Sequence, residues 1–382
     1  MALIEHAAGQ PGLGRPTPVS AKLIDWSRFL RRPLYHVPAG DADAVFRKKT
    51  LLITGAGGSI GSVLANRFLG GPAETLLLLD HSLPNLSELQ RRFELRHVNQ
   101  PAVEFLHTDI LNESGMSELF GKYRPNIVFH AAALKHLPEL ESDPFAALET
   151  NVLGTLRLLK MAEVSGVECF VNVSSDKAVN PTSVLGVSKR IAELILATEP
   201  AAPRRVSLRL GNVLGSSGSF VPLFMRHLEE GRSPCITDPR ASRYFVSPDE
   251  AAAFLMQSIA ALAGPLLLPE MGGPQRIIEL ANFLLEESYG SAAGLSPRFT
   301  GLRDGEKLCE ELTYDYEILE DSSVPQIRKI GGNSIFDAGQ FAGKLTRLID
   351  LVLRRHKSGL VRTLCSMVPE FVPSPTFLSY VH

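Results

Sequence analysis

Short apolar runs alternate with amphipathic stretches between residues 46 and 210. The runs have the length and composition of buried strands, and the stretches between them have helical periodicity. The runs expected to be strands are residues 50–53, 76–79, 103–107, 127–130 and 170–173. Strands that alternate with helices form βαβ units, so the pattern predicts an α/β fold with a doubly wound parallel sheet of the Rossmann type.

The chain as a whole divides into four segments. Proline-rich sequence and the only tryptophan, Trp26, mark the first, in which a short helix is expected near residues 21–30. The segments are an arm or linker (1–45), the α/β domain (46–210, to which the chain returns around 245–270), a smaller and more irregular substrate-binding lobe (mainly 211–330), and a helical C-terminal tail (331–382).

The composition narrows the class of protein. With 45% hydrophobic and 21% charged residues, the chain is globular rather than disordered or fibrous. A formal net charge of −2 predicts no nucleic-acid partner. The most apolar window, residues 251–268, is interrupted by Gly264 and Pro265 and predicts a buried helix that ends at these two residues rather than a membrane span. No signal peptide is evident and the four cysteines form no Cys-x-x-Cys pair, so we expect no metal site and a cytoplasmic location.

A glycine-rich turn follows the first expected strand and precedes a helical stretch. Its sequence, Thr-Gly-Ala-Gly-Gly-Ser-Ile-Gly, spans residues 54–61. Residues without a Cβ permit a tight turn and close approach of a phosphate, and a helix N-terminus offers free N–H groups to a pyrophosphate. The motif therefore predicts a dinucleotide site rather than an ordinary turn. The expected contact residues are Gly55, Gly57, Gly58, Ser59, Ile60 and Gly61.

Acidic and small residues follow the next three expected strands. Asp80 ends the second strand, where a carboxylate accepts hydrogen bonds from the adenosine ribose and repels a 2′-phosphate, which favours NAD and leaves NADP as the alternative. Asp109 follows the third strand and either meets the adenine amino group or caps a helix. Ala131 and Ala132 follow the fourth strand, and their small side chains let the backbone approach the cofactor.

A hydroxyl, a carboxylate and an amine follow the fifth expected strand, at Ser175, Asp176 and Lys177. Ligands bind beyond the carboxyl ends of parallel strands, so we expect these groups to be catalytic rather than caps for the next helix. That helix is expected to begin near residue 182 or 183. It carries Lys189, which is spaced to hold the nicotinamide ribose; the alternative is a solvated helix lysine.

Several motifs together resemble a known family. They are residues 54–61, 130–141 (HAAALKHLPELE), 150–155 (TNVLGT), 173–190 (VSSDKAVNPTSVLGVSKR), 209–220 (RLGNVLGSSGSF), 242–245 (SRYF), 301–312 (GLRDGEKLCEEL) and 368–371 (VPEF). With them the chain resembles the extended short-chain dehydrogenases/reductases. More narrowly, it is similar to the CapD-type polysaccharide biosynthesis proteins, the UDP-N-acetylglucosamine 4,6-dehydratases.

The resemblance implies a reaction and the groups that perform it. Carbon 4 of a UDP-sugar is oxidised by the nicotinamide, water is eliminated across carbons 5 and 6, and the hydride returns to carbon 6. The NAD is therefore tightly bound and recycled. The resemblance implies Asp176 as the acid, Lys177 as the base at carbon 5, Ser175 near O4 and Lys189 on the nicotinamide ribose.

The resemblance also implies a substrate site in the lobe. Asn212 would meet the nucleotide diphosphate, Arg243 and Arg303 would neutralise it, and Glu306 would contact the ribose or uracil. Each arginine has a surface salt bridge as its alternative, and Lys135 is expected near the sugar without an assigned role. The expected partners are a UDP-sugar and further copies of the chain. Membrane members of the family carry transmembrane helices before the catalytic half, whereas none is expected here.

One residue departs from the wider superfamily. The usual Tyr-x-x-x-Lys places a tyrosine four residues before the lysine, but here that position is Leu185. Membrane-type members often have methionine there and are active, which fits a dehydratase. A nucleotide-sugar 4-epimerase normally needs the tyrosine. It stays as one alternative, and a non-catalytic dinucleotide-binding protein is the other.

Overall fold

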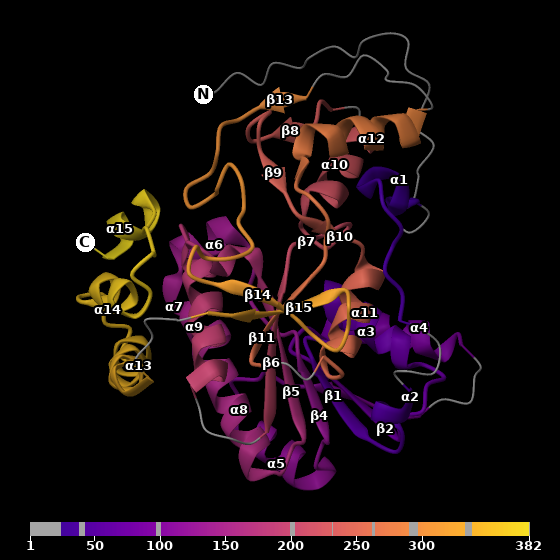
Figure 1. Ribbon diagram of the computed structural model, residues 1–382, viewed down its shortest axis with the longest axis vertical. Helices are drawn as coiled ribbons and strands as arrows, with labels where there is room; N and C mark the ends of the chain where they lie inside the picture. The colour runs from indigo at the N-terminus through magenta and orange to yellow at the C-terminus, as the bar shows by residue number, and fades with distance from the viewer. Residues whose placement is uncertain are drawn as a thin grey trace.

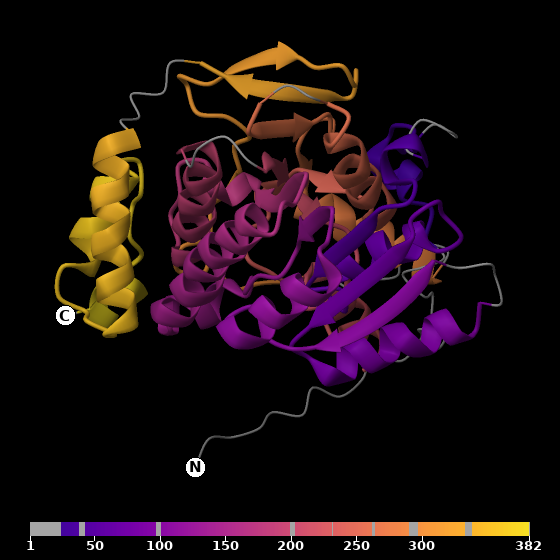
Figure 2. The ribbon, with the colours of Figure 1, turned by 90° about the horizontal axis from the view of Figure 1, so that it is seen from below.

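Nine strands form one sheet in the structure, a computed structural model that describes residues 24–37, 43–96, 101–198, 203–230, 232–261, 264–289, 297–332 and 338–381. They are β1 (Thr50–Thr54), β2 (Thr75–Asp80), β3 (Ala102–His107), β4 (Ile127–His130), β5 (Cys169–Ser175), β6 (Arg204–Leu210), β11 (Leu266–Pro269), β14 (Ile318–Asp321) and β15 (Ile327–Gly331). The order is β14-β15-β11-β6-β5-β4-β1-β2-β3. All neighbours from β11 to β3 pair in parallel, and β14 and β15 are antiparallel (Figures 1 and 2).

Helices cover both faces of this sheet because its strands bury side chains on both sides (Figure 1). Leu51 and Ile53 of β1 pack into one apolar cluster, and Leu52 between them packs into the other. The first cluster includes side chains of α3 (Ser59–Phe68), α4 (Leu83–Glu94) and α11 (Pro248–Ser258). The second includes side chains of α5 (Glu113–Tyr123), α8 (Thr155–Val164) and α9 (Val184–Thr198). The predicted doubly wound α/β class is confirmed.

A smaller lobe lies beyond the carboxyl ends of the parallel strands (Figure 1). Its described elements are α10 (Phe220–Glu229), α12 (Ile277–Tyr289) and the short strands β7 (Asn212–Val213), β8 (Cys235–Ile236), β9 (Ser242–Arg243), β10 (Phe245–Val246), β12 (Gln275–Arg276) and β13 (Arg298–Phe299). The arm packs against it through α1 (Trp26–Leu30), where the rings of Trp26 and Phe29 lie 6.3 and 5.6 Å from that of Phe283. Residues 21–23 of the expected arm helix lie outside the described residues.

Two stretches of the 211–330 segment fold differently from the sequence-based expectation. The hairpin of β14 and β15 joins the central sheet, because Ile327 and Ile330 are buried in the same cluster as β11. The buried helix expected to end at Gly264 and Pro265 ends earlier, since α11 stops at Ser258. Residues 266–268 belong to β11, which pairs in parallel with β6. No helix within the described ranges is both long and apolar enough to cross a membrane.

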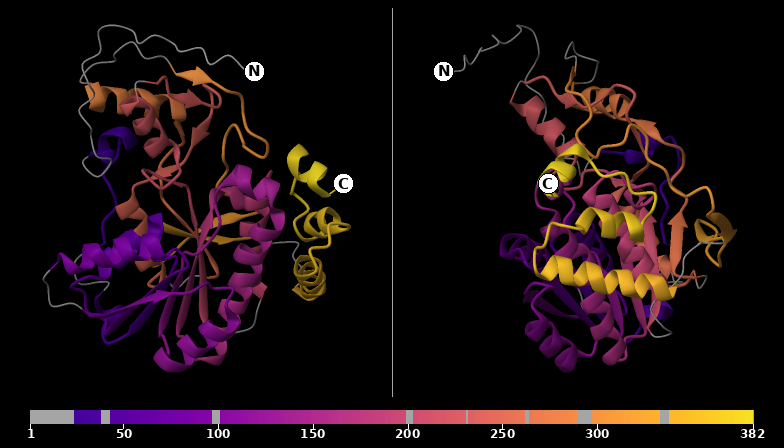
Figure 3. Two further views of the ribbon diagram at one scale, coloured as in Figure 1. Left: turned by 180° about the vertical axis from the view of Figure 1, so that it is seen from behind. Right: turned by 90° about the vertical axis from the view of Figure 1, so that its left-hand side faces the viewer.

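The C-terminal tail is helical, as predicted. It contains α13 (Ala338–Leu353), α14 (Leu360–Met367) and α15 (Pro375–Val381), which lie beside the layer of α6 (Leu137–Ser142), α7 (Pro144–Leu148), α8 and α9 (Figures 1 and 3). Leu345, Leu348 and Phe377 of the tail are buried in the same apolar cluster as that layer. The carboxylate of Glu141 accepts hydrogen bonds from Ser374 Oγ and from the N–H of Val184, so the tail is tied to the start of α9.

A buried ion network joins strands, helix and loop beneath the lobe. Arg209 of β6 is fully buried and donates to both carboxylate oxygens of Glu193 on α9 at 3.1 and 2.9 Å. It also donates to Glu317 at 2.8 Å and to the carbonyl of Leu312 at 2.7 Å. Burial alone would raise the pKa of Glu193, but Arg209 holds that pKa below its ordinary value.

Arg209→Met should lower the free energy of unfolding by about 3–5 kcal/mol, because it leaves two buried carboxylates without their main cation. The matched control is Arg226→Met. Arg226 pairs with Glu230 while 68% of its side chain is exposed, and its loss should cost less than about 1 kcal/mol. Denaturant unfolding followed by circular dichroism measures both. Equal, small shifts would contradict the role given to Arg209.

Candidate active site

The glycine-rich turn connects β1 to the N-terminus of α3. Gly55 has φ +66°, and a Cβ there would lie 2.7 Å from the backbone nitrogen of Ala132. A Cβ on Gly61 would lie 2.1 Å from the carbonyl oxygen of Gly55. Only glycine fits such approaches, so the turn, α3 and the end of β4 pack backbone against backbone. The result is a concave surface of N–H groups at a helix N-terminus, which suits a phosphate.

The carboxylate of Asp80 stabilises this turn by accepting hydrogen bonds from backbone N–H groups. Its Oδ2 accepts a hydrogen bond from the N–H of Gly57 at 2.9 Å, and its Oδ1 accepts one from the N–H of Ser82 at 2.8 Å. Asp109 is exposed, and its Oδ1 accepts from the N–H of Leu111 at 2.9 Å. Both carboxylates therefore have backbone partners, and their predicted contacts with adenosine stay predictions.

A cavity of about 350 Å³ lies between the glycine-rich turn and the ends of β4 and β5. Of the residues predicted to contact the cofactor, those lining it are Gly55, Gly58, Ser59, Ile60, Gly61, Ala131 and Lys189. Those outside its lining are Gly57, Asp80, Asp109 and Ala132. Lys135, expected near the sugar, lines this cavity as well and donates to the carbonyl of Ser217 at 2.9 Å.

Helix α9 contributes two side chains to the same cavity. Lys189 donates to the carbonyl of Val173 at 3.1 Å, and burial lowers the pKa of its ammonium to about 8. Leu185 lies one turn earlier on the helix and also lines the cavity. An apolar side chain therefore stands where the wider superfamily has a proton-exchanging hydroxyl.

The three polar residues after β5 form one hydrogen-bonded group. Ser175 Oγ donates to Asp176 Oδ1 at 2.8 Å, and Lys177 Nζ donates to the same oxygen at 3.1 Å. Asp176 is fully buried and does not line this cavity, whereas Ser175 and Lys177 do. Burial raises the pKa of Asp176 above its ordinary value. Asp176 would therefore act on a bound ligand through its two hydrogen-bond partners, Ser175 and Lys177.

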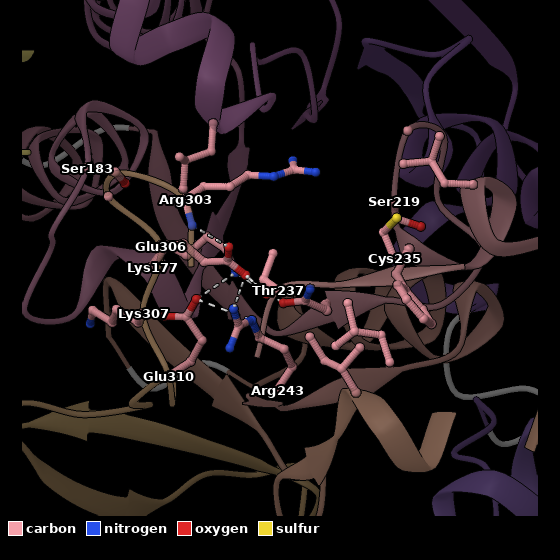
Figure 4. Close-up of a pocket in the computed structure, with 18 of the residues that line it drawn as sticks. Lys177, Ser183, Ser219, Cys235, Thr237, Arg243, Arg303, Glu306, Lys307 and Glu310 are labelled. Carbon is pink, nitrogen blue, oxygen red and sulfur yellow. Dashed lines mark hydrogen bonds and ion pairs between the residues drawn. The ribbon is translucent and has the colours of Figure 1, made fainter. Parts of the chain in front are cut away.

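A second cavity of about 290 Å³ lies between the lobe and the sheet (Figure 4). The predicted substrate residues that line it are Asn212, Arg243, Arg303 and Glu306. Arg243 donates to Glu306 at 2.8 Å, and Thr237 donates to the same carboxylate at 3.0 Å. Phe220, Leu223 and Ile236 give this cavity an apolar wall.

The two cavities share Lys177, Asn212, Gly218 and Ser219 in their linings. Lys177 Nζ donates to Asn212 Oδ1 at 3.0 Å, which fixes the amine at this junction. A group bound in one cavity and a group bound in the other would meet beside Lys177. The arrangement suits a reaction between two ligands, with a lysine at the point of contact.

Sequence reasoning missed Glu310. Its carboxylate lies 3.2 Å from Lys177 Nζ, lines the second cavity and comes from the segment before β14. It belongs to the motif at residues 301–312, but it lies 133 positions after Lys177 in the sequence, and the packing of its loop against the end of β5 brings the two side chains together. No periodicity or spacing signal connects the two positions.

The fold is that of an extended short-chain dehydrogenase/reductase. Comparison with known sequences agrees: residues 51–331 match the polysaccharide biosynthesis protein family, and the chain belongs to that family. A solved structure, Pen from Bacillus thuringiensis, has the same fold, with a TM-score of 0.66 at 24% identity over 79% of this chain and 98% of that one. The resemblance stated from the motifs is confirmed.

Individual relatives carry different names. The chain is 38% identical over 289 residues to the probable polysaccharide biosynthesis protein EpsC of Bacillus subtilis, covering 73% of this chain and 47% of that protein. It thus spans about half the length of this relative. It is 30% identical to a UDP-N-acetylglucosamine 4,6-dehydratase (inverting) of Campylobacter jejuni, over 72% of this chain and 82% of that one. It is 32% identical to a UDP-glucose 4-epimerase of Rickettsia rickettsii, over 75% of this chain and 84% of that one.

Gly61→Ala should weaken NAD binding at least about tenfold, because the new methyl group collides with backbone that cannot move without opening the turn. Gly121→Ala is the matched control, since a Cβ at this α5 position meets nothing within 4 Å. It should leave binding unchanged and stabilise the helix by up to about 1 kcal/mol. Titration calorimetry on cofactor-stripped protein measures both. Equal affinities for the two variants would refute this account of the turn.

Proposed function

We propose that the protein is an NAD-dependent 4,6-dehydratase of UDP-N-acetylglucosamine or a similar UDP-sugar, serving surface polysaccharide or glycan synthesis. The position of Lys177 carries the proposal, because it stands where the two cavities meet and is backed by a buried carboxylate. The relative named as a 4,6-dehydratase supports it. A cytoplasmic location and assembly into a homo-oligomer remain predictions.

The first cavity suits a nicotinamide dinucleotide. Gly55, Gly58 and Gly61 leave backbone exposed where a pyrophosphate would lie, and Lys189 reaches the other end of the cavity from α9. When bound, NAD takes a hydride from carbon 4 of the sugar and returns it to carbon 6. The buried ammonium of Lys189 would hold the ribose and stabilise negative charge nearby.

The second cavity suits the UDP moiety. The guanidinium groups of Arg243 and Arg303 would neutralise the diphosphate, with Asn212 beside it. Arg243 is paired with Glu306, so a diphosphate would compete with that carboxylate. The sugar would then extend toward the junction, where its carbons 4, 5 and 6 lie beside Ser175 and Lys177.

Elimination needs a base at carbon 5, and Lys177 is the amine at the junction. The proton on O4 needs another acceptor, since Leu185 has none to offer. We assign this step to Ser175, whose hydroxyl takes the O4 proton as it passes its own to Asp176 Oδ1. Asp176 can hold that proton because burial favours its neutral form. The same proton is then available, through Ser175 or Lys177, for the departing 6-hydroxyl.

A 4-epimerase is the second candidate, favoured by the relatives that carry that name. Epimerisation needs the same oxidation at carbon 4 but no base at carbon 5 and no acid at O6. Asp176 and Lys177 would have no task in it. Mass spectrometry after incubation with UDP-N-acetylglucosamine distinguishes the two, since only the dehydratase releases a water.

Lys177→Met should reduce dehydration about 10²–10⁴-fold with little change in substrate binding, because the lost amine acts only in the elimination step. Reduced cofactor should accumulate after substrate is mixed in, and its near-ultraviolet absorbance reports it. Leu185→Ala is the comparison variant and should show only the modest loss of a packing defect. Near-normal dehydration by Lys177→Met would remove Lys177 from the mechanism.

The purified protein should carry bound nicotinamide cofactor, mainly NAD, because the hydride returns within one turnover and because the Asp80 carboxylate disfavours a 2′-phosphate. Denaturing the protein and chromatographing the supernatant measures the cofactor. Recovery of NADP alone would overturn the argument from Asp80. Recovery of no nucleotide would show that the cofactor exchanges freely.

A further inference from the structure

The amine of Lys177 is surrounded by three acceptors. Asn212 Oδ1 lies 3.0 Å away, Asp176 Oδ1 3.1 Å and Glu310 Oε1 3.2 Å. An ammonium has three N–H donors, and three partners use all of them. The resting form is therefore a fully paired cation, whereas a base needs a free lone pair. Lys177 must lose one proton before it can take another from carbon 5.

The two carboxylates around this cation differ in where they face. Asp176 lines neither cavity, but Glu310 lines the substrate cavity (Figure 4). Glu310 Oε2 and Asp176 Oδ2 are both buried and have no hydrogen-bond partner among the described residues. An oxygen without a donor is free to bind a proton. Glu310 is thus the acceptor on the side from which the sugar would arrive.

We propose that Glu310 is a positioning residue that holds Lys177 Nζ at the junction of the cavities and receives the proton that Lys177 sheds before it acts as a base. This inference rests on the proposed function. One N–H bond of the ammonium breaks and one O–H bond forms on the carboxyl group. The pair stays neutral overall, so the transfer needs no further reactant.

Charges from several elements act on this pair. Burial lowers the pKa of Lys177 and Arg243 adds to that effect, but Asp176 and Glu310 outweigh them and raise it. Burial raises the pKa of Glu310, but Lys177, Arg243 and Lys307 outweigh it and hold that pKa below its ordinary value. Arg243 is also a proposed diphosphate ligand. A bound diphosphate would offset its charge and make Glu310 a better proton acceptor once substrate is in place.

Glu310→Gln tests the proposal, because the amide keeps the shape and removes the charge. The matched control is Glu306→Gln, which also frees Arg243 but has no contact with Lys177 in the described structure. Acetic anhydride labelling of Lys177 across a pH series, read by peptide mass spectrometry, reports the pKa of the amine without any need for activity. The labelling midpoint should fall by about 1–3 pH units in Glu310→Gln and stay at the wild-type value in Glu306→Gln.

Dehydration of UDP-N-acetylglucosamine gives the second readout. In Glu310→Gln the rising limb of the pH–rate profile should move to lower pH with the labelling midpoint. Turnover should fall about 10²-fold, because Lys177 Nζ is no longer held in position at the junction of the cavities. Glu311→Gln serves as the activity control, since Glu311 faces solvent with Lys307 and Asn180. A rate loss with no shift in either pH midpoint would overturn the proposal and leave Glu310 a structural role only.

The outcomes separate this inference from the proposed function. A wild-type protein that dehydrates no UDP-sugar but shows the labelling shift would refute the proposed function and support the pairing of Glu310 with Lys177. If Glu310→Gln does not fold, Glu310→Asp replaces it. That variant keeps the charge but withdraws it by one methylene, so it should keep a raised labelling midpoint yet lose turnover. A midpoint equal to that of free lysine would contradict the proposal.

Discussion

The buried guanidinium of Arg209 determines how the parts of the site are held together. It links β6 to α9 through Glu193 and to the 312–317 segment through Glu317 and the Leu312 carbonyl. Glu193 in turn accepts from Ser174 Oγ at 2.6 Å, next to the reactive group after β5. A buried cation is tolerable only when carboxylates and carbonyls surround it. Meeting that requirement fixes three separate pieces of chain. Helix α9 carries Lys189, while Asn212 and Glu310 lie close in sequence to β6 and to the 312–317 segment.

A cation surrounded by acceptors also lies at the junction of the two cavities, with one difference. Around Arg209 every strong donor has a close acceptor, which gives rigidity. Around Lys177 the acceptors are also present, but its two carboxylate partners, Asp176 and Glu310, each keep one oxygen without a donor among the described residues. A fully paired network is a scaffold, whereas an incompletely paired one can move a proton. The network around Arg209 thus holds in place the elements that carry the residues around Lys177.

Much of the fold could be predicted from the sequence, and the site only in part. The run at residues 127–130 is β4 as predicted, because a strand buried on both faces is apolar throughout. Strand β5 extends to Ser175 because that residue pairs with Leu210 of β6, and α9 begins at Val184, whose N–H donates to the distant Glu141. Glycine spacing predicted the turn before α3. The contact of Glu310 with Lys177 and the place of the β14–β15 hairpin depend on tertiary packing, which leaves no periodic signal in the sequence.

The central claim is that Lys177 removes the carbon 5 proton of a UDP-sugar at the meeting point of two cavities. Incubation with UDP-N-acetylglucosamine in deuterated water, followed by mass spectrometry and proton NMR, tests it most directly. The account predicts a product lighter by one water that carries solvent deuterium at carbon 5, because the abstracted proton is replaced from solvent after the elimination. An epimer of unchanged composition, with hydrogen retained at carbon 5, would contradict it.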